Sequence, residues 1–412
     1  MVVVAERPAT DLMDALEKAG AFPIVEATVA DAPSAVAEVQ PVGLVVAETR
    51  LPDNVPHLQA LVRAIETRGG PYMPVFVRAD GPSAVDIPFA LPVAIAEPVD
   101  SLIARLRSAL RVRSLHATVL RRSRAAQLPI AATVTLAGFL DHATVLCVGR
   151  ARSYPLLTTA IAEQTGLIGA MSVETAGRYL KARDVDGIVI GEGFQPRVVE
   201  ALLTVLGEDA RFRDLPVGVL GRFPVSESRL CNLIRVESDA SLLVERMLPF
   251  VRVQALESQL KRLLKSLEAD GVLDPDTGLL GREAFWRDLD RAVQQAEVDG
   301  SALSVARFSF DDMTDARCAV DAARLFSRLV RDIDFACREQ DGSILAAFTE
   351  TDLRSAHVVA RRIASVLRHT MLSPDLERQT IKPCVTLATL KPSDNLSTLV
   401  ARVGTYPKVA AR

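Results

Sequence analysis

The segments GLVVAETRLP (Gly43–Pro52) and DGIVIG (Asp186–Gly191) decide the fold of the first two thirds of the chain. Each contains a short aliphatic run without polar alternation, which is typical of a strand buried on both faces of a parallel sheet. Around the first segment the runs are Val2–Ala5, Phe22–Val25, Gly43–Ala47, Pro74–Val77 and Val93–Ala96. Helical spacing of apolar residues separates these runs, and a last helix is expected from about Val99 to beyond Leu115. Five βα units of this kind predict an α/β, doubly wound, flavodoxin-like sheet.

The same pattern repeats from near Ala143. The second set of runs is Thr144–Val148, Leu167–Met171, Gly187–Ile190 and Pro216–Leu220, with a fainter fifth strand near Leu233–Val236. The basic, polar stretch Arg121–Ala126 is interpreted as a linker between the two sets. We therefore expect one domain over residues 1–125 and a second over residues 140–268.

A long helix is expected from about Ser241 to Glu268, with apolar residues mostly three or four apart. Such a stripe is typical of a coiled coil or signalling helix, and equally of a helix that packs on its own sheet. We expect packing in its first half and pairing with a second copy in its second half. Residues 270–412 mix strands and helices without strict alternation, which favours an α+β domain.

Composition and charge exclude several classes of function. The chain has 412 residues, of which 49% are hydrophobic and 24% are charged, and its net charge is −3. This balance predicts no general attraction to nucleic acid or to an anionic membrane. The N-terminus lacks the pattern of a signal peptide, and no apolar run is long enough to cross a bilayer. Scattered cysteines and histidines show no metal spacing, so we expect a cytoplasmic protein without a metal site.

The first two domains resemble receiver domains of response regulators. That family implies an Asp after the third strand, an acidic pair after the first, a Ser or Thr after the fourth and a Lys after the fifth. The first domain instead has Glu48, Ala5–Glu6, Arg78 and Glu97 at these places, and the second has Gly191 at the acceptor position. We therefore expect no phosphorylation at either domain.

The third domain resembles GGDEF domains of diguanylate cyclases. DPDTGLLGREAF (Asp274–Phe285) matches the opening motif at Asp274, Thr277, Gly278, Leu279 and Arg282. The catalytic places depart from the family. A metal-binding Asp would fall on Ala306 or Arg307, the signature turn falls on Gln340–Ile344, and Tyr406–Lys408 replaces a later motif. These departures predict a degenerate cyclase domain that is not an enzyme and uses no cofactor or metal.

One group of functional residues of the GGDEF family is retained. An inhibitory Arg-x-x-Asp site stands a fixed distance before the signature turn, and here Arg331 and Asp334 occupy it, with Arg362 as the second arginine. The resemblance implies that cyclic di-GMP binds there. An arginine fork matches the O6/N7 edge of guanine, and a carboxylate can accept from the N1/N2 edge.

The order receiver–receiver–GGDEF resembles response regulators of the PleD type and, more closely, of the PopA type. The resemblance implies a cyclic di-GMP effector in signal transduction and a homodimer. It also implies protein partners, with a role as a protease adaptor in regulated proteolysis and cell-cycle control. Two alternatives stay open, a ligand-independent dimeric scaffold and a residual diguanylate cyclase. In the scaffold, Arg331 and Asp334 would form only a salt bridge.

Overall fold

The computed structural model divides into two compact units, residues 1–260 and 261–412. The structure describes residues 1–47, 55–78, 87, 89–125, 140, 143–222, 229–269, 272–311, 316–331, 333–369, 382–392 and 394–404. The two predicted domains in residues 1–268 fall almost wholly in the first unit. The expected boundaries at residues 125, 140 and 270 stay predictions.

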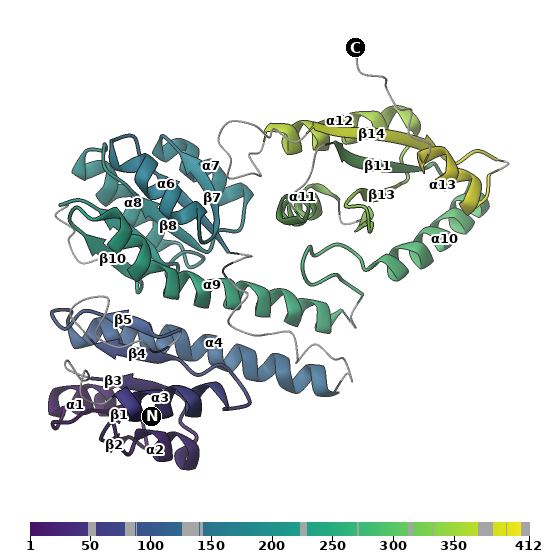
Figure 1. Ribbon diagram of the computed structural model, residues 1–412. Helices are drawn as coiled ribbons and strands as arrows, with labels where there is room; N and C mark the ends of the chain where they lie inside the picture. Colours follow the sequence, from purple (N-terminus) through teal and green to yellow (C-terminus); the bar gives the residue numbers. More distant parts are fainter. Residues whose placement is uncertain are drawn as a thin grey trace. The chain divides into compact units, whose positions relative to one another are not determined.

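The first sheet is parallel and has the strand order β2-β1-β3-β4-β5 (Figure 1). Its strands are β1 (Val2–Val4), β2 (Val25–Ala27), β3 (Leu44–Val46), β4 (Val75–Arg78) and β5 (Leu91–Val93). Its helices are α1 (Thr10–Lys18), α2 (Ala32–Val39), α3 (Val55–Glu66) and α4 (Val99–Ala125). This is the flavodoxin-like order of a doubly wound sheet.

The second sheet is also parallel, with the order β10-β9-β8-β6-β7. Its strands are β6 (Thr144–Val148), β7 (Gly166–Ala170), β8 (Gly187–Ile190), β9 (Val217–Leu220) and β10 (Leu233–Val236). Its helices are α6 (Ser153–Ala162), α7 (Val173–Ala182), α8 (Pro196–Glu208) and α9 (Ala240–Glu268). Numbered within the repeat, the strand order is the same as in the first sheet, so the predicted repetition of one fold is confirmed at the level of topology.

Arg121–Ala126 does not begin a linker as interpreted from its charge. Helix α4 continues to Ala125, and Ser123 on it is fully buried. Arginine is a good helix former, so a run of basic residues is compatible with an extended helix.

The second unit carries a four-stranded antiparallel sheet of order β12-β13-β11-β14. Its elements are α10 (Arg282–Asp299), β11 (Leu303–Asp311), α11 (Ala316–Leu329), β12 (Phe335–Arg338), β13 (Ile344–Thr349), α12 (Leu353–His369), β14 (Lys382–Thr389) and α13 (Leu396–Gly404). Side chains of α11 and α12 share one core with Phe308, whereas those of α10 and α13 share another with Val305. Helices therefore cover both faces, because alternate residues of β11 point to opposite sides.

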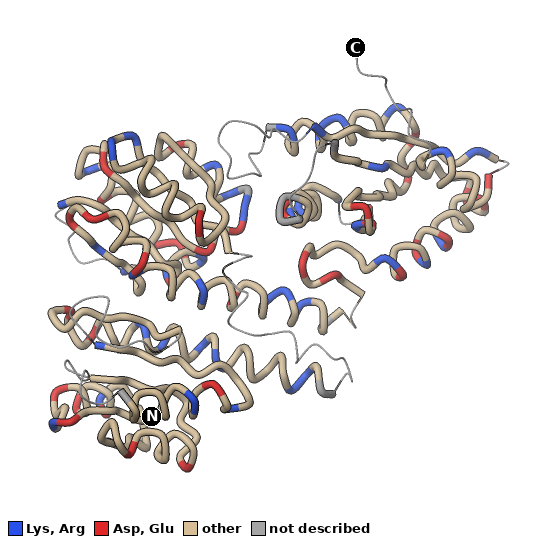
Figure 2. The backbone as a smooth tube through the Cα atoms, viewed as in Figure 1, with Lys and Arg blue, Asp and Glu red and all other residues tan. Residues whose placement is uncertain are grey.

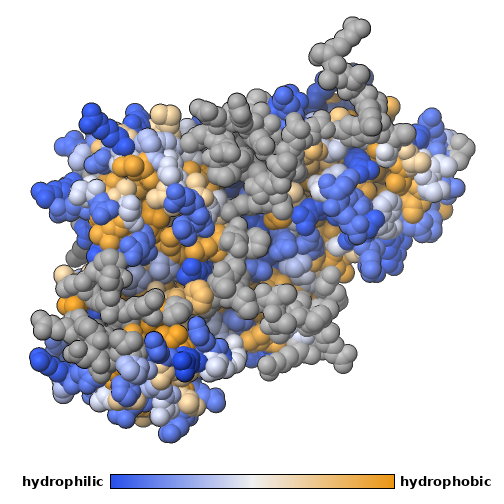
Figure 3. Space-filling model, in the orientation of Figure 1, coloured by the Kyte–Doolittle hydropathy of each residue, from blue (hydrophilic) through white to orange (hydrophobic). Residues whose placement is uncertain are grey.

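The surface mixes polar and apolar areas. Exposed apolar side chains occur on α6 and α8, including Leu156 and Val205, and Figure 3 shows orange areas over this part of the molecule. Isolated apolar side chains at a surface are ordinary in folded proteins. Among the described residues, the structure has no helix long and apolar enough to cross a membrane.

Candidate functional site

Arg331 and Asp334 lie in the short connection between α11 and β12. The side chain of Arg331 is exposed, whereas Asp334 is only 7% exposed. Within the described ranges, the Arg331 guanidinium has no hydrogen bond or ion pair. The connection thus combines a buried carboxylate with an exposed cation whose charge acts on it.

Hydrogen bonds of Asp334 hold this connection together. Its Oδ1 accepts a hydrogen bond from the Thr349 N–H at 3.0 Å, and its own N–H donates to the Arg331 carbonyl at 3.0 Å. The Thr349 hydroxyl donates to the Ile333 carbonyl at 2.9 Å. Two of these bonds tie the end of β13 to the turn and the third closes the turn itself, so together they fix the backbone from which the Arg331 side chain projects.

The buried position also affects the proton affinity of Asp334. Burial raises the pKa of its carboxyl group, while the Thr349 N–H and the charge of Arg331 oppose that rise. The net direction is upward, because desolvation penalises the charged form more than these partners stabilise it.

Arg362 lies on α12, where it is exposed next to the equally exposed Arg361. Helices α11 and α12 bury their apolar faces in one core, with Phe326 and Ile363 both fully buried. Figure 2 shows blue basic segments along the length of α12. The structure therefore places Arg331 after one helix of a packed pair and Arg362 on the other.

The opening motif of the unit serves local structure. The Asp274 carboxylate accepts from the Asp276 N–H at 2.8 Å, and Gly278 has a φ of +74°, which favours glycine. Arg282 then begins α10 and pairs with Glu339 at 2.9 Å. These residues shape a tight turn and anchor the following helix beside the β12–β13 turn.

The β12–β13 turn and β11 bring together two places singled out in the sequence. Gly342 has a φ of +81° and completes the hairpin, as expected. Arg307 on β11 forms an ion pair with Asp341 of this turn. Burial raises the pKa of Asp341, but hydrogen bonds from Ser343 and the charge of Arg307 outweigh it, so the pKa lies below its ordinary value.

The other positions of interest are spread over the two parallel sheets or fall outside the described residues. Arg78 donates to the Ile95 carbonyl at 3.1 Å, Glu97 pairs with Arg105 at 3.0 Å, and the Gly191 N–H donates to the Val148 carbonyl at 2.7 Å. Glu48 and Tyr406–Lys408 lie outside the described residues. Among those that are described, no group of three or more His, Cys, Asp or Glu side chains could hold a metal ion.

Sequence reasoning missed the buried Arg105. Its side chain is 3% exposed, and it donates to the Leu233 carbonyl at 2.9 Å and the Cys231 carbonyl at 3.3 Å. The sequence feature that could have identified Arg105 as buried is its position in an apolar stripe of α4, between the buried Ile103 and Leu106. A charge in such a stripe indicates a paired, buried group.

Comparisons with known proteins gave matches among solved structures alone. No family model matches the chain, and no curated protein does. The coiled coil and GGDEF domain of DgcB from Caulobacter crescentus, in complex with c-di-GMP, is 22% identical, covers 35% of this chain and 83% of its own, and has a TM-score of 0.31. The diguanylate cyclase SiaD of Pseudomonas aeruginosa, in complex with its activator SiaC, is 21% identical over 35% of this chain and 59% of its own, with a TM-score of 0.31.

A third similar structure is the active GGEEF domain of a diguanylate cyclase from Vibrio cholerae, which is 18% identical over 30% of this chain and 86% of its own, with a TM-score of 0.28. The structural neighbours are thus GGDEF domains of diguanylate cyclases. This finding contradicts the prediction that the chain is not an enzyme, and that prediction is withdrawn. Replaced residues alone do not decide whether a protein is active, because activity depends on the geometry and chemistry of the whole site.

Proposed function

We propose that the C-terminal unit binds cyclic di-GMP through Arg331, Asp334 and Arg362, and that the chain acts as a receptor and scaffold in signal transduction. The observation that carries this proposal is the turn at Asp334, where an exposed guanidinium without a hydrogen bond or ion pair among the described residues acts electrostatically on a buried carboxylate. A fixed backbone reduces the ordering that Arg331 must undergo when a ligand binds.

The chemistry of the three side chains matches a guanine nucleotide. The Arg331 fork can donate to the O6 and N7 atoms of one guanine. Asp334 has one oxygen engaged by Thr349, which leaves Oδ2 to accept from the guanine N1/N2 edge. Arg362 can stack on a base or pair with a phosphate, since a guanidinium does both.

The two parallel-sheet domains have a separate part in the proposal. Their flavodoxin-like strand order supports the assignment of receiver-like domains over residues 1–125 and 140–268. We assign them a role in packing and homodimerisation, with the cyclic di-GMP signal passed to protein partners such as a protease adaptor complex. Cyclic di-GMP would shift the equilibrium between two such assemblies only to the extent that it binds one of them more tightly than the other.

Calorimetric titration of the full chain with cyclic di-GMP tests the site. Arg331→Ala and Arg362→Ala should each weaken binding by about 5- to 150-fold, the equivalent of roughly 1–3 kcal/mol for a bidentate contact. Arg361→Ala is the matched control, because that arginine is exposed on the same helix, and it should leave the affinity unchanged.

Two results would count against this function. Unchanged affinity in Arg331→Ala would refute the site while leaving a cyclic di-GMP receptor possible elsewhere in the chain. No binding by the wild-type chain would refute the receptor itself and favour the ligand-independent scaffold, in which the Asp334 turn is purely structural.

A further inference from the structure

Two residues of α4 hold the chain just before strand β4. The His116 Nδ1 atom accepts a hydrogen bond from the Tyr72 N–H at 3.0 Å. The Arg113 guanidinium donates to the carbonyl of Pro71 at 3.1 Å and to that of Tyr72 at 3.0 Å. Residues three apart lie on one face of a helix, so a single face of α4 binds both the N–H and the carbonyl of Tyr72. The segment 71–73 is thus fastened to α4 by an acceptor and a donor together.

The hydrogen bond between His116 and Tyr72 is shielded from water. Each of the two residues is 6% exposed. A buried backbone N–H needs an acceptor, and an imidazole nitrogen is an acceptor only while it carries no proton. The geometry therefore requires a neutral ring with its proton on Nε2. It also makes Nδ1, the atom that a proton would occupy in acid, the atom on which the Tyr72 N–H depends.

The charges around the His116 ring oppose its protonation. Burial lowers the pKa of His116, and the positive charge of Arg113 lowers it further. Arg68, in the connection from α3 to β4, adds a positive charge that acts on Arg113. The phenol of Tyr72 stays neutral, because burial raises its pKa. A proton on His116 would therefore put a second cation beside Arg113 and bring two N–H donors face to face.

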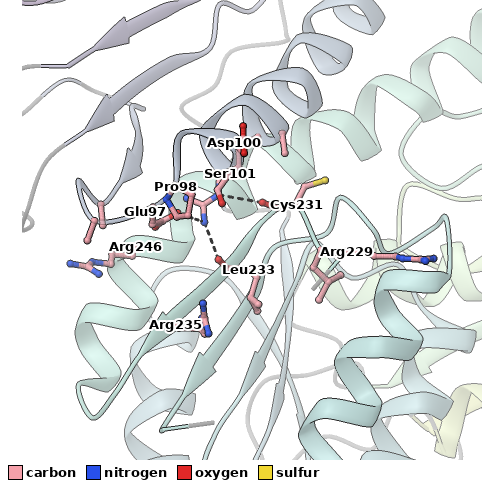
Figure 4. Close-up of a pocket in the computed structure, with 14 residues that line it drawn as sticks. Glu97, Pro98, Asp100, Ser101, Arg229, Cys231, Leu233, Arg235 and Arg246 are labelled. Carbon is pink, nitrogen blue, oxygen red and sulfur yellow. Dashed lines mark hydrogen bonds and ion pairs between the residues drawn. The ribbon is translucent and has the colours of Figure 1, made fainter. Parts of the chain in front are cut away.

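Two glycines precede the fastened segment. Gly69 and Gly70 are exposed, and a side chain added at either would meet no atom within 4 Å. Gly70 has a φ of +107°, a conformation that favours glycine. A hinge is a short stretch of chain that absorbs a large backbone change, and these two residues suit that role. Helix α4 is anchored elsewhere, because Arg105 in its first half donates to the carbonyls of Cys231 and Leu233 (Figure 4).

We propose that His116 and the Tyr72 N–H form an acid-sensitive latch between α4 and the segment 71–73. A proton taken from solvent onto Nδ1 breaks the hydrogen bond, and the segment then moves away from α4 about Gly69 and Gly70. The closed latch has its full stability above the ordinary histidine pKa of 6.5, and it loses that stability as pH falls from there to the lower pKa of the closed form. Acid thereby exposes Tyr72 and Met73, which are both buried while the latch is closed.

Hydrogen–deuterium exchange of the full chain, followed by mass spectrometry, tests the latch. Pro71 and Pro74 have no N–H, so a peptide of residues 70–75 carries few amides besides that of Tyr72. After correction for the intrinsic exchange rate, the protection of this peptide should fall about tenfold between pH 7.5 and pH 5. The reason is that the open form binds the proton more tightly, so each pH unit below its pKa shifts the equilibrium toward opening by up to about tenfold.

Two variants separate the latch from a general effect of acid. His116→Asn should remove the pH dependence, because asparagine carries an amide oxygen at the branch position of Nδ1, and this oxygen can accept from Tyr72 but does not titrate. His57→Asn is the matched control, since His57 is an exposed histidine on α3, and this variant should keep the pH dependence.

Three results would overturn the latch. The first is protection of residues 70–75 that stays constant between the two pH values in the wild type. The second is the same pH dependence in the wild type and in His116→Asn. The third is an equal loss of protection in the central strand β3, because acid would then unfold the domain rather than open one segment. The first and third results need only the wild-type chain, so the test does not depend on the folding of a variant.

Discussion

Arg105→Ala is expected to destabilise the first unit strongly. The side chain is 3% exposed, donates to the carbonyls of Leu233 and Cys231, and pairs with Glu97 at 3.0 Å. It also lies 5.2 Å from the centre of the Phe250 ring. Desolvation lowers the pKa of this arginine, and the charge and hydrogen bond of Glu97 oppose that fall.

The magnitude follows from what the alanine variant leaves behind. Two carbonyls lose charge-assisted bonds worth roughly 1.5–3 kcal/mol each. Glu97 is about a third exposed, so water can replace its partner at little cost. The sum agrees with the loss of about 3–5 kcal/mol expected when one member of a buried ion pair is removed. With a urea slope of about 1–3 kcal/mol per molar, the midpoint should fall by at least about 1 M.

Two optical probes separate the units in this experiment. The single tryptophan, Trp286, lies in α10 of the second unit, so its fluorescence follows that unit, whereas far-UV circular dichroism follows both. Arg105→Ala should shift the dichroism transition and leave the fluorescence transition in place. Arg111→Ala is the control: Arg111 comes from the same helix and pairs with Asp214 at 2.5 Å, but its side chain is 57% exposed. That variant should lose less than about 1 kcal/mol, and an equal loss in the two variants would refute the reasoning.

Four other predictions concern two glycines, one aspartate and one cysteine of the chain. Gly342→Ala should destabilise the second unit by about 1–2 kcal/mol in fluorescence-monitored urea unfolding, because Gly342 has a φ of +81°. Gly177→Ala should instead stabilise the first unit by about 0.5–1 kcal/mol, because Gly177 lies in a helix with open space around the added methyl group. Burial raises the pKa of Asp334, so the folded state binds the proton of this carboxyl group more tightly than the unfolded state does. The contribution of Asp334 to the stability of the wild type therefore falls as pH rises through the pKa of the folded state. Asp334→Asn should therefore gain stability relative to wild type between pH 3 and pH 7, and a pH-independent difference between their urea midpoints would contradict this. Burial raises the pKa of Cys147 to about 12, so iodoacetamide at pH 8 should leave this thiol unmodified until urea unfolds the protein, as peptide mass spectrometry can show.

The strands were largely predictable because their aliphatic runs are buried on both faces. Even the faint run Leu233–Val236 proved to be the complete strand β10. Strand β12 (Phe335–Arg338) leaves little signal in the sequence, because it has four residues, two of them only partly buried, and no clear alternation. Helix α13 (Leu396–Gly404) also leaves a weak signal, because it has only nine residues.

The site was predictable only in part, since sequence spacing shows which residues are present and not what they contact. The resemblance to GGDEF domains implied a ligand site at Arg331, Asp334 and Arg362, and the burial of Asp334 became visible only in the fold. The carbonyls of Cys231 and Leu233 that Arg105 binds are more than a hundred residues away in the chain, so no local pattern could reveal them. Long-range polar contacts of this kind depend on how domains pack, which hydrophobic periodicity does not encode.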